Sequence, residues 1–252
     1  MGKRRVITFA LTMATFFPAI AAEVAIQFQS TAPQTALLEL YTSEGCSSCP
    51  PAEQWLSRLT DSPRLWREFV PVSFHVDYWD DLGWQDPWGK AEFSQRQRNY
   101  GAAWHSRTIY TPEFVLNGKE WRRRSGADVP KSSSLNAGIV QVSSADTNNW
   151  AVRFTPMPGG PTNYQAHVVW LVSGVKSDVK AGENAGRTLK HDFVVLSHTE
   201  AAMKFQPDGA ESSLNLPMPT AVGPGRLAVA VWITEPTRIE PIQATGGWVT
   251  RP

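Results

Sequence analysis

The chain has 252 residues, enough for one large domain or two domains of ordinary size. Its 24 basic and 23 acidic side chains leave a formal net charge of +1, without a long run of either sign. This balance gives no indication of the strongly basic surface typical of nucleic-acid binding or of attraction to an anionic membrane, so we expect no nucleic-acid partner.

The N-terminus has the organisation of a secretory signal peptide. A basic start at residues 3–5 precedes a mostly apolar run from Val6 to Ile20, and Ala19-Ile20-Ala21 fits a small-x-small cleavage site. The apolar run is shorter than the roughly 20 residues that a spanning helix needs. The pattern predicts a signal peptide over residues 1–22, a periplasmic or secreted location, and no membrane attachment after cleavage. An uncleaved N-terminal anchor is the alternative.

The two cysteines of the chain, Cys46 and Cys49, stand close together. They follow an apolar segment, Leu37–Thr42, that predicts a buried strand, and they precede Pro50-Pro51, which suit the first turn of a helix. A strand, a Cys-x-x-Cys turn and a helix in this order are typical of a redox site. The helix N-terminus favours thiolates. We therefore expect Cys46 and Cys49 to be catalytic and to form a redox disulfide, with Cys46 attacking and Cys49 as the buried resolving thiol.

Two other uses of the cysteine pair are alternatives. A structural disulfide between positions i and i+3 closes a very short loop, so it constrains the unfolded chain little. Two thiolates can bind copper or zinc, but a closed zinc site needs about four ligands and the chain has no second cysteine pair. His75 and His105 are weak additional ligands, because His75 lies in a predicted strand and is best explained as a hydrogen-bonded core residue. We predict no metal site.

The next segments predict a mixture of helices and strands. In chain order, the expected elements are a helix at Pro50–Leu59, a strand at Val70–Val76, an aromatic-rich loop at Tyr78–Trp88 and a helix at Lys90–Trp104. Residues Tyr110–Glu120 predict a β-hairpin that turns at Asn117-Gly118. A last helix is expected within Val129–Val142.

From about Asn148 the pattern changes to short β-strands separated by glycine and proline turns. The alternating segments are Trp150–Phe154, Tyr164–Val172, Phe193–Ser197 and Leu227–Ile233. Such spacing predicts an antiparallel sandwich or half-barrel of about 100 residues. The polar residues near its turns, Arg187, His191 and His198, receive no functional role.

Four motifs occur along the chain: TSEGCSSCPPAE, FHVDYWDDLGWQDP, YTPEFVLNG and GENAGRTL. Together they resemble DUF1223, a family of exported proteins of uncharacterised function that carries a thioredoxin-like domain. The resemblance implies an α/β thioredoxin-like domain with a CxxC site over residues 33–144. A mostly antiparallel, sandwich-like β region is expected to follow over residues 145–252.

The resemblance to the thioredoxin-like superfamily also implies a substrate contact. In that superfamily a cis-proline lies beside the disulfide, and the residue before it offers backbone groups to an extended substrate chain. Pro112 and Thr111 match these positions, so we expect them to bind substrate. The superfamily's buried aspartate, six residues before the first cysteine, is replaced here by Leu40. Glu39 points to the opposite face and Glu44 lies in the turn, and either is a possible substitute.

These observations predict an exported thiol-disulfide oxidoreductase-like protein. Its partner would be a protein or small-thiol disulfide, exchanged through a mixed disulfide without an organic cofactor. One alternative is a non-enzymatic metal carrier, for copper above all, that uses the two thiolates. The other is a redox-inactive binding scaffold, because a fold does not establish a function.

Overall fold

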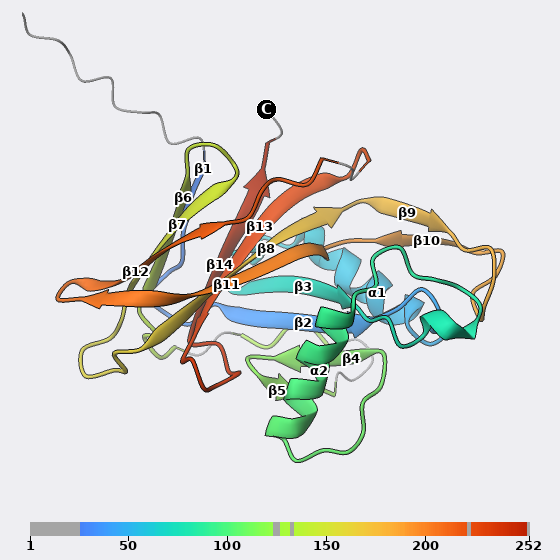
Figure 1. Cartoon of the computed structure of the whole chain (residues 1–252), viewed down its shortest axis with the longest axis horizontal. Helices are drawn as coiled ribbons and strands as arrows, with labels where there is room; N and C mark the ends of the chain where they lie inside the picture. Colours follow the sequence, from blue (N-terminus) through green and yellow to red (C-terminus); the bar gives the residue numbers. More distant parts are fainter. Residues whose placement is uncertain (1–25, 123–126, 132–133, 221–222, 251–252) are drawn as a thin grey trace, which may run out of the picture.

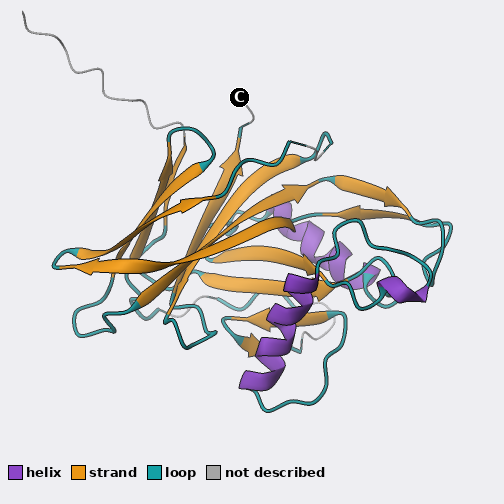
Figure 2. Ribbon diagram, viewed as in Figure 1, coloured by secondary structure: helices purple, strands orange, loops and turns teal. Residues whose placement is uncertain are grey.

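A computed structural model describes residues 26–122, 127–131, 134–220 and 223–250 (Figure 1). Within these residues the chain is mostly β-strand, with the α-helices α1 (Pro50–Ser57) and α2 (Ala91–Ala103) and the 3-10 helices η1 (Arg58–Asp61) and η2 (Asp80–Leu82) (Figure 2). Neither α-helix in this part has the length and hydropathy of a membrane-spanning segment. The predicted signal peptide, residues 1–22, lies outside the described residues.

Twelve of the described strands form one mixed sheet, and two more pair as a separate hairpin. The strands of the sheet are β1 (Ile26–Gln29), β2 (Ala36–Thr42), β3 (Phe69–His75), β4 (Glu113–Leu116), β5 (Lys119–Glu120), β6 (Ile139–Ser144), β7 (Asn149–Thr155), β8 (Tyr164–Ser173), β11 (Val194–Gln206), β12 (Gly209–Asn215), β13 (Arg226–Thr234) and β14 (Gln243–Val249). The hairpin consists of β9 (Val175–Asp178) and β10 (Thr188–His191).

Strand β11 joins the parts of the sheet. Its Val194 pairs in parallel with Ser73 of β3, while most of its length pairs antiparallel with β8 and its end pairs with β12. Strands β2 and β3 are parallel to each other, and β4 runs antiparallel to β2. The N-terminal and C-terminal halves of the chain therefore contribute to the same sheet.

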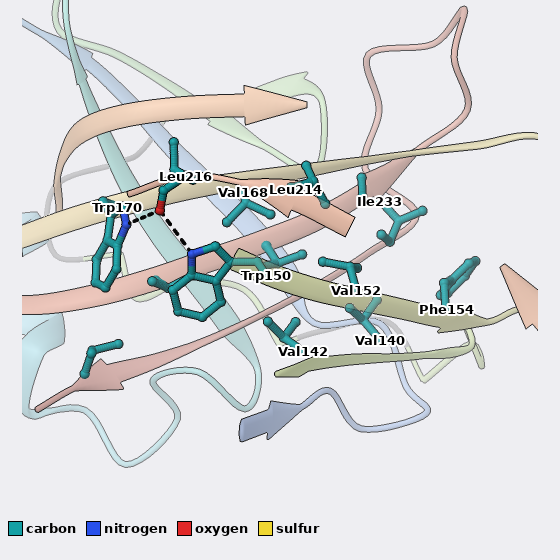
Figure 3. Close-up of a cluster of buried hydrophobic side chains, with 14 of the residues drawn as sticks. Val140, Val142, Trp150, Val152, Phe154, Val168, Trp170, Leu214, Leu216 and Ile233 are labelled. Carbon is teal, nitrogen blue, oxygen red and sulfur yellow. Dashed lines mark hydrogen bonds between the residues drawn. The ribbon is translucent and has the colours of Figure 1, made fainter. Parts of the chain in front are cut away.

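One hydrophobic core lies between two layers of this sheet, with β6, β7 and β12 on one side and β8 and β13 on the other. Trp150 of β7 and Trp170 of β8 meet in it (Figure 3). Both indole N–H groups donate to the carbonyl of Leu216, at 3.2 and 3.0 Å. Two large side chains are thus buried with their polar atoms paired.

Strand β2 lies between two further cores. Leu37 and Tyr41 face the cluster that contains Phe93 of α2, whereas Leu38 and Leu40 face the cluster on the α1 side. All seven residues of β2 are buried, as expected for a strand covered on both faces. Strand β2 is therefore fixed by packing on both faces at the point where it leads into the turn at residues 43–49, just before α1.

The predicted fold class is wrong. The described chain is mostly β with a large mixed sheet, and not an α/β thioredoxin-like domain followed by a sandwich-like region. The clearest local error is the helix expected within Val129–Val142: its end forms β6, which pairs with β1 and β7. The β-branched residues Ile139, Val140 and Val142 suit this strand, where partly buried and fully buried positions alternate.

Other local predictions are confirmed. The strands near 37–42 and 70–76, the helix at 90–104 and the hairpin turning at Asn117-Gly118 correspond to β2, β3, α2 and the β4–β5 pair. The predicted domain boundary after Ser144 falls between β6 and β7, which are antiparallel neighbours. The division into residues 33–144 and 145–252 stays a prediction.

Candidate functional site

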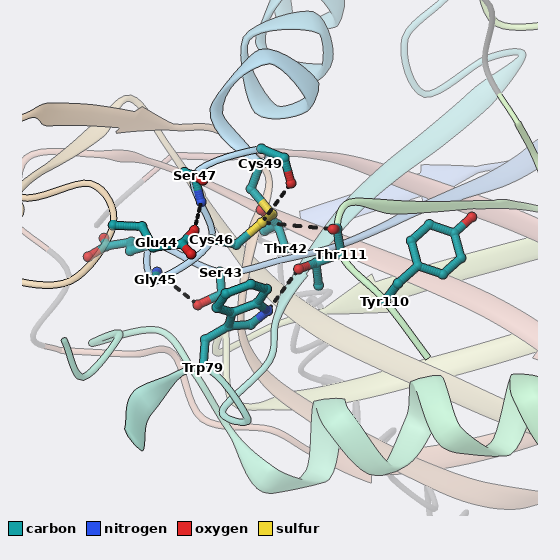
Figure 4. Close-up of a disulfide and its surroundings, with 12 residues drawn as sticks. Thr42, Ser43, Glu44, Gly45, Cys46, Ser47, Cys49, Trp79, Tyr110 and Thr111 are labelled. Carbon is teal, nitrogen blue, oxygen red and sulfur yellow. Dashed lines mark hydrogen bonds between the residues drawn. A yellow bond between two sulfur atoms is a disulfide. The ribbon is translucent and has the colours of Figure 1, made fainter. Parts of the chain in front are cut away.

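The Cys46–Cys49 pair lies between the end of β2 and the start of α1 (Figure 4). The two residues form a disulfide, and their Cα atoms are 5.5 Å apart. The amide of Cys49 donates to the carbonyl of Cys46 at 3.2 Å, which closes the turn. Pro50 and Pro51 occupy the first helical positions, where a missing N–H leaves no unpaired donor. The predicted order of strand, CxxC turn and helix is therefore confirmed.

Two oxygen atoms lie next to the sulfur of Cys46. The hydroxyl Oγ of Ser48 is 3.2 Å from Cys46 Sγ, and the carbonyl oxygen of Thr111 is 3.8 Å from it. The Thr111–Pro112 peptide bond is cis, as the family resemblance implied. The structure thus brings Thr111 against Cys46, while the catalytic and substrate-binding roles of these residues stay predictions.

Both cysteines are completely buried, although Ser47 and Ser48 between them are exposed. Trp79 packs closely against this turn: a Cβ added at Gly45 would lie 2.9 Å from Trp79 Cβ, so glycine is needed for the approach. The indole N–H of Trp79 donates to Thr111 Oγ1 at 2.9 Å. A partner sulfur therefore reaches Cys46 only when the covering residues move.

A buried network of charged side chains starts in the same turn. Glu44 belongs to the turn, Glu53 to α1 and His191 to β10, and each of these side chains is less than a tenth exposed. His191 Nδ1 lies 2.5 Å from Glu53 Oε2, and His191 Nε2 lies 3.1 Å from Glu44 Oε1, an ion-pair distance without hydrogen-bond alignment. Thr42 Oγ1 and Trp84 Nε1 donate to the remaining oxygens of Glu53 and Glu44, at 2.5 and 2.7 Å.

The carboxylates of Glu53 and Glu44 determine whether His191 is protonated. Burial alone would lower the pKa of His191, but Glu53 and Glu44 outweigh burial and raise that pKa to about 10. Burial would likewise raise the pKa of Glu53, but the His191 imidazolium lowers it below its ordinary value. At neutral pH His191 is therefore a cation between two carboxylates, close to the N-terminus of α1.

A second buried pair supports the network from β3. His75 Nδ1 lies 2.7 Å from Asp86 Oδ2, and the same carboxylate oxygen accepts the amide of Glu44 at 2.8 Å. Burial would raise the pKa of Asp86, but His75 and these hydrogen bonds lower it. The prediction that His75 is a hydrogen-bonded core histidine is confirmed. Ligand atoms of Glu53, His75 and His191 lie within 4.8 Å of one another, but their polar contacts and complete enclosure make this an internal charge network.

The loop between β9 and β10 holds the cysteine turn from the other side. Asn184, which is fully buried, donates through Nδ2 to the carbonyls of Glu44 and Cys46 at 2.8 and 3.0 Å. The Ser47 amide donates to Glu183 Oε2 at 2.9 Å. Arg187 Nη1 donates to Asn184 Oδ1 at 2.7 Å and fixes the amide orientation. The GENAGRTL segment therefore forms a clamp on the CxxC turn.

A cavity of about 270 Å³ opens beside the turn. Ser48 and Pro112 line it next to the disulfide, and Tyr110, Phe114 and Trp121 supply aromatic walls. This cavity places aromatic side chains and the polar groups of Ser48 and Arg122 immediately beside Pro112, where a partner group could lie.

The profile of one protein family covers most of the chain. The family described as "Protein of unknown function (DUF1223)" matches residues 37–234, which include the cysteine turn, the Thr111–Pro112 segment and the clamp. The chain belongs to the DUF1223 family. No curated protein sequence matches it.

Two solved structures share the fold of this DUF1223 chain. One is a protein from Agrobacterium tumefaciens, a target of the Northeast Structural Genomics Consortium. It is 23% identical, the match covers 87% of this chain and 95% of that one, and the TM-score is 0.58. The other is HBP35 of Porphyromonas gingivalis, 11% identical, with coverage of 87% and 76% and a TM-score of 0.55. At these identities the likeness concerns the fold alone.

Sequence reasoning missed the residues of this DUF1223 site that come from distant segments. His191 and the clamp residues Glu183 and Asn184 lie more than 130 positions after the cysteines they support. The GENAGRTL motif marks this segment as part of the family pattern, but nothing in its sequence indicates that it contacts the cysteine turn. The sequence indicates Glu44 as a substitute for the missing aspartate, whereas it gives no separate signal for Glu53.

Proposed function

We propose that this protein exchanges disulfides with a thiol partner through Cys46 and Cys49. The observation that carries the proposal is the disulfide itself, placed at the N-terminus of α1 with the Thr111 carbonyl and the Ser48 hydroxyl beside Cys46. A bond that spans three positions adds little stability to a folded chain of this size. Its position at a helix N-terminus instead favours a thiolate when the bond opens.

The exchange proceeds through a mixed disulfide. A partner thiolate attacks Cys46 Sγ, the Cys46–Cys49 bond breaks, and Cys49 leaves as a thiolate near the first amides of α1. A second thiolate of the partner then attacks the partner sulfur, so that Cys46 is released and the partner is oxidised. In reverse, the Cys46 thiolate attacks a partner disulfide and Cys49 displaces the product.

The surroundings of the pair support a polypeptide partner. The cavity beside Pro112 has aromatic walls, and the Thr111 backbone lies next to the reacting sulfur, so an extended chain there would present its own sulfur to Cys46. Because both cysteines are buried in the disulfide form, entry requires displacement of Trp79 or of residues 110–112. An exported location, as residues 1–22 predict, would keep the pair in an oxidising compartment.

Redox titration tests the proposal directly. The purified protein is equilibrated in glutathione buffers and its free thiols are counted, with the Cys46→Ser/Cys49→Ser variant as the blank. We expect a reversible two-electron transition with a potential between about −270 and −120 mV, the range of known exchange proteins.

Trapping of the mixed disulfide provides the second measurement. The Cys49→Ser variant is expected to accumulate a mixed disulfide at Cys46, because the resolving thiol is missing, whereas Cys46→Ser is not. A disulfide that resists reduction throughout this range, with no trapped intermediate, would contradict exchange and favour a structural cross-link. A pair that never oxidises but holds one copper or zinc ion would favour the thiolate metal carrier.

A further inference from the structure

A second cavity has a volume of about 950 Å³ and is lined by other residues than those of the cysteine turn. Its walls come from α2, strands β8 and β11 and the segment after β13. Two of the chain's five histidines line it, His167 of β8 and His198 of β11, together with Glu200 of β11. His167 is buried, His198 is half-buried, and Glu200 is exposed to the cavity side.

The pairing of three neighbouring strands brings these side chains together. Glu200 lies directly opposite His167, which in turn lies opposite Trp232 of β13. The register between β11 and β8 shifts by one residue between Val195 and Ser197. This β-bulge turns His198 and Glu200 to the face that Val195 occupies before it, and bulges that re-aim side chains are common beside functional sites.

The three side chains converge on a small volume. His167 Nδ1 is 3.2 Å from His198 Nε2 and 3.0 Å from Glu200 Oε2, and all three ligand atoms lie within 4.8 Å of one another. Two ligands held at about 2.0–2.1 Å by one tetrahedral ion lie roughly 3.3 Å apart. The two separations from His167 Nδ1 are close to that spacing, and the third pair of ligand atoms lies within 4.8 Å.

We propose that His167, His198 and Glu200 bind a divalent metal ion of borderline softness, with zinc as the best match. Two imidazoles and one carboxylate are a ligand set that zinc uses in sites where a further coordination position stays open. All three side chains line the cavity, so water or a small anionic ligand could reach an ion bound between them. The site uses neither cysteine and does not depend on the proposed exchange reaction.

A proton can pair only two of these three atoms at a time. If His167 Nδ1 carries a proton, it can donate to Glu200 Oε2 or to His198 Nε2; if it carries none, it can accept the Nε2 proton of His198. A cation between the three atoms would accept a lone pair from each of them.

The neighbouring residues hold the ligands in a binding orientation. His167 Nε2 lies 3.1 Å from Thr234 Oγ1, so its second ring nitrogen has a partner while Nδ1 points to the other ligands. The rings of His167 and His198 both stack on Trp232, with centroids 4.9 and 5.5 Å away. Two arginines line the cavity, and each is paired with a carboxylate that offsets its repulsion of a cation. Arg96, which stacks on Trp232, lies 2.8 Å from Glu39, and Arg238 lies 3.5 Å from Glu240.

Calorimetric titration tests the site with Zn²⁺ itself. Purified protein without an affinity tag is stripped of metal and titrated with ZnCl₂. We expect one ion per chain, and we expect excess Mg²⁺ not to displace it, because imidazole ligands disfavour that ion. His198→Gln and Glu200→Gln are each expected to weaken binding by more than the roughly 10-fold to 100-fold loss typical of removing a supporting residue.

Matched variants keep the test specific. Glu200 has a half-exposed side chain, so its conversion to glutamine leaves the fold intact, and circular dichroism verifies this. The exposed histidine variant His105→Asn and the Cys46→Ser/Cys49→Ser variant are expected to bind Zn²⁺ as the wild type does. Absence of saturable one-to-one binding, binding unchanged in both His198→Gln and Glu200→Gln, or binding lost with the cysteines would each overturn the proposal.

Discussion

The cysteine end of the molecule and the cavity beside α2 each hold a histidine next to a carboxylate, but the surroundings give these two histidines different charges. Burial would lower the pKa of His191, yet two enclosed carboxylates raise it to about 10. At the cavity, burial first and then Arg96 and His167 lower the pKa of His198 to about 3. His191 is therefore a cation at neutral pH, whereas His198 is neutral with a lone pair available.

The carboxylates differ as strongly as the histidines. Glu44 and Glu53 are enclosed, so their charges require the His191 imidazolium as an internal counter-ion. Glu200 is half-exposed; its pKa is lowered to about 2, first by the hydrogen bond from His167, and solvent screens its charge. Because the His191 cluster is enclosed on all sides, its charged groups can pair only with one another and have a structural role. The His198 cluster has the same residue types but is open on one side, so a ligand can reach it.

The same substitution in the two clusters gives the largest expected difference. His191→Gln leaves Glu44 and Glu53 buried without a counter-charge and should lower the free energy of unfolding by about 3–5 kcal/mol. His198→Gln removes a neutral, half-buried ring and should lower it by less than about 1.5 kcal/mol. Urea denaturation of both variants measures this. Equal destabilisation would mean that His191 is not the required cation.

The pH dependence of stability sharpens the contrast. The folded-state pKa of His191, about 10, lies above its unfolded value of about 6.5, so the folded chain keeps a proton that the unfolded chain loses. This stabilisation is complete below pH 6.5 and is lost as pH rises towards 10, at up to about 1.4 kcal/mol per pH unit. Glu53, whose pKa is lowered, loses its contribution instead as pH falls below its unfolded value.

The difference between wild type and His191→Gln isolates this effect from other titrating groups. Unfolding free energies measured at several values between pH 6 and pH 10 should converge as pH rises, because the wild type loses what the variant already lacks. Curves that stay parallel would show that His191 is neutral in the folded protein.

The sequence predicts features built from neighbouring residues, but not those built from residues that are far apart in the chain. The CxxC turn, the helix at Pro50 and the Thr111–Pro112 segment were predictable because each is a local pattern or a matched motif. The cis bond beside Cys46 followed from the resemblance. The same resemblance also gave the wrong fold class, because local helix and strand signals do not reveal that β11 joins β3 to the C-terminal strands.

The histidine clusters depend on register, which no local pattern fixes. His198 reaches the cavity because one extra residue of β11 shifts its pairing with β8, and a sequence does not show a bulge of this kind. His191 reaches Glu53 because the β9–β10 hairpin extends beside the start of α1 (Figure 1). Both are long-range arrangements, and their residues therefore received no role from the sequence.

Zinc is expected to act on one cluster only. At a free concentration about 100 times its dissociation constant, Zn²⁺ should add about 2.7 kcal/mol to the stability of the wild type. Because the two clusters share no ligand, His191→Gln should gain the same increment, and His198→Gln should gain almost none. Urea denaturation with and without ZnCl₂ measures the three increments. A gain in His198→Gln equal to that of the wild type would place the ion elsewhere.

The clamp that joins the His191 cluster to the disulfide is expected to contribute less stability than the His191 cation. Asn184→Ala leaves the carbonyls of Glu44 and Cys46 without their buried donor, which should lower stability by about 2 kcal/mol. Asn163→Ala, at an exposed position, serves as the control and should stay within about 0.5 kcal/mol of the wild type.

The oxidation state of the cysteines makes this last variant informative about function. If the clamp holds the turn more tightly in the disulfide form, Asn184→Ala destabilises the oxidised protein more than the reduced one. The disulfide then becomes easier to reduce, by about 30 mV for each 1.4 kcal/mol of that difference. Unfolding of both forms and the glutathione titration give independent values for this quantity. Equal destabilisation with an unchanged potential would limit the clamp to a structural role, separate from the exchange chemistry beside it.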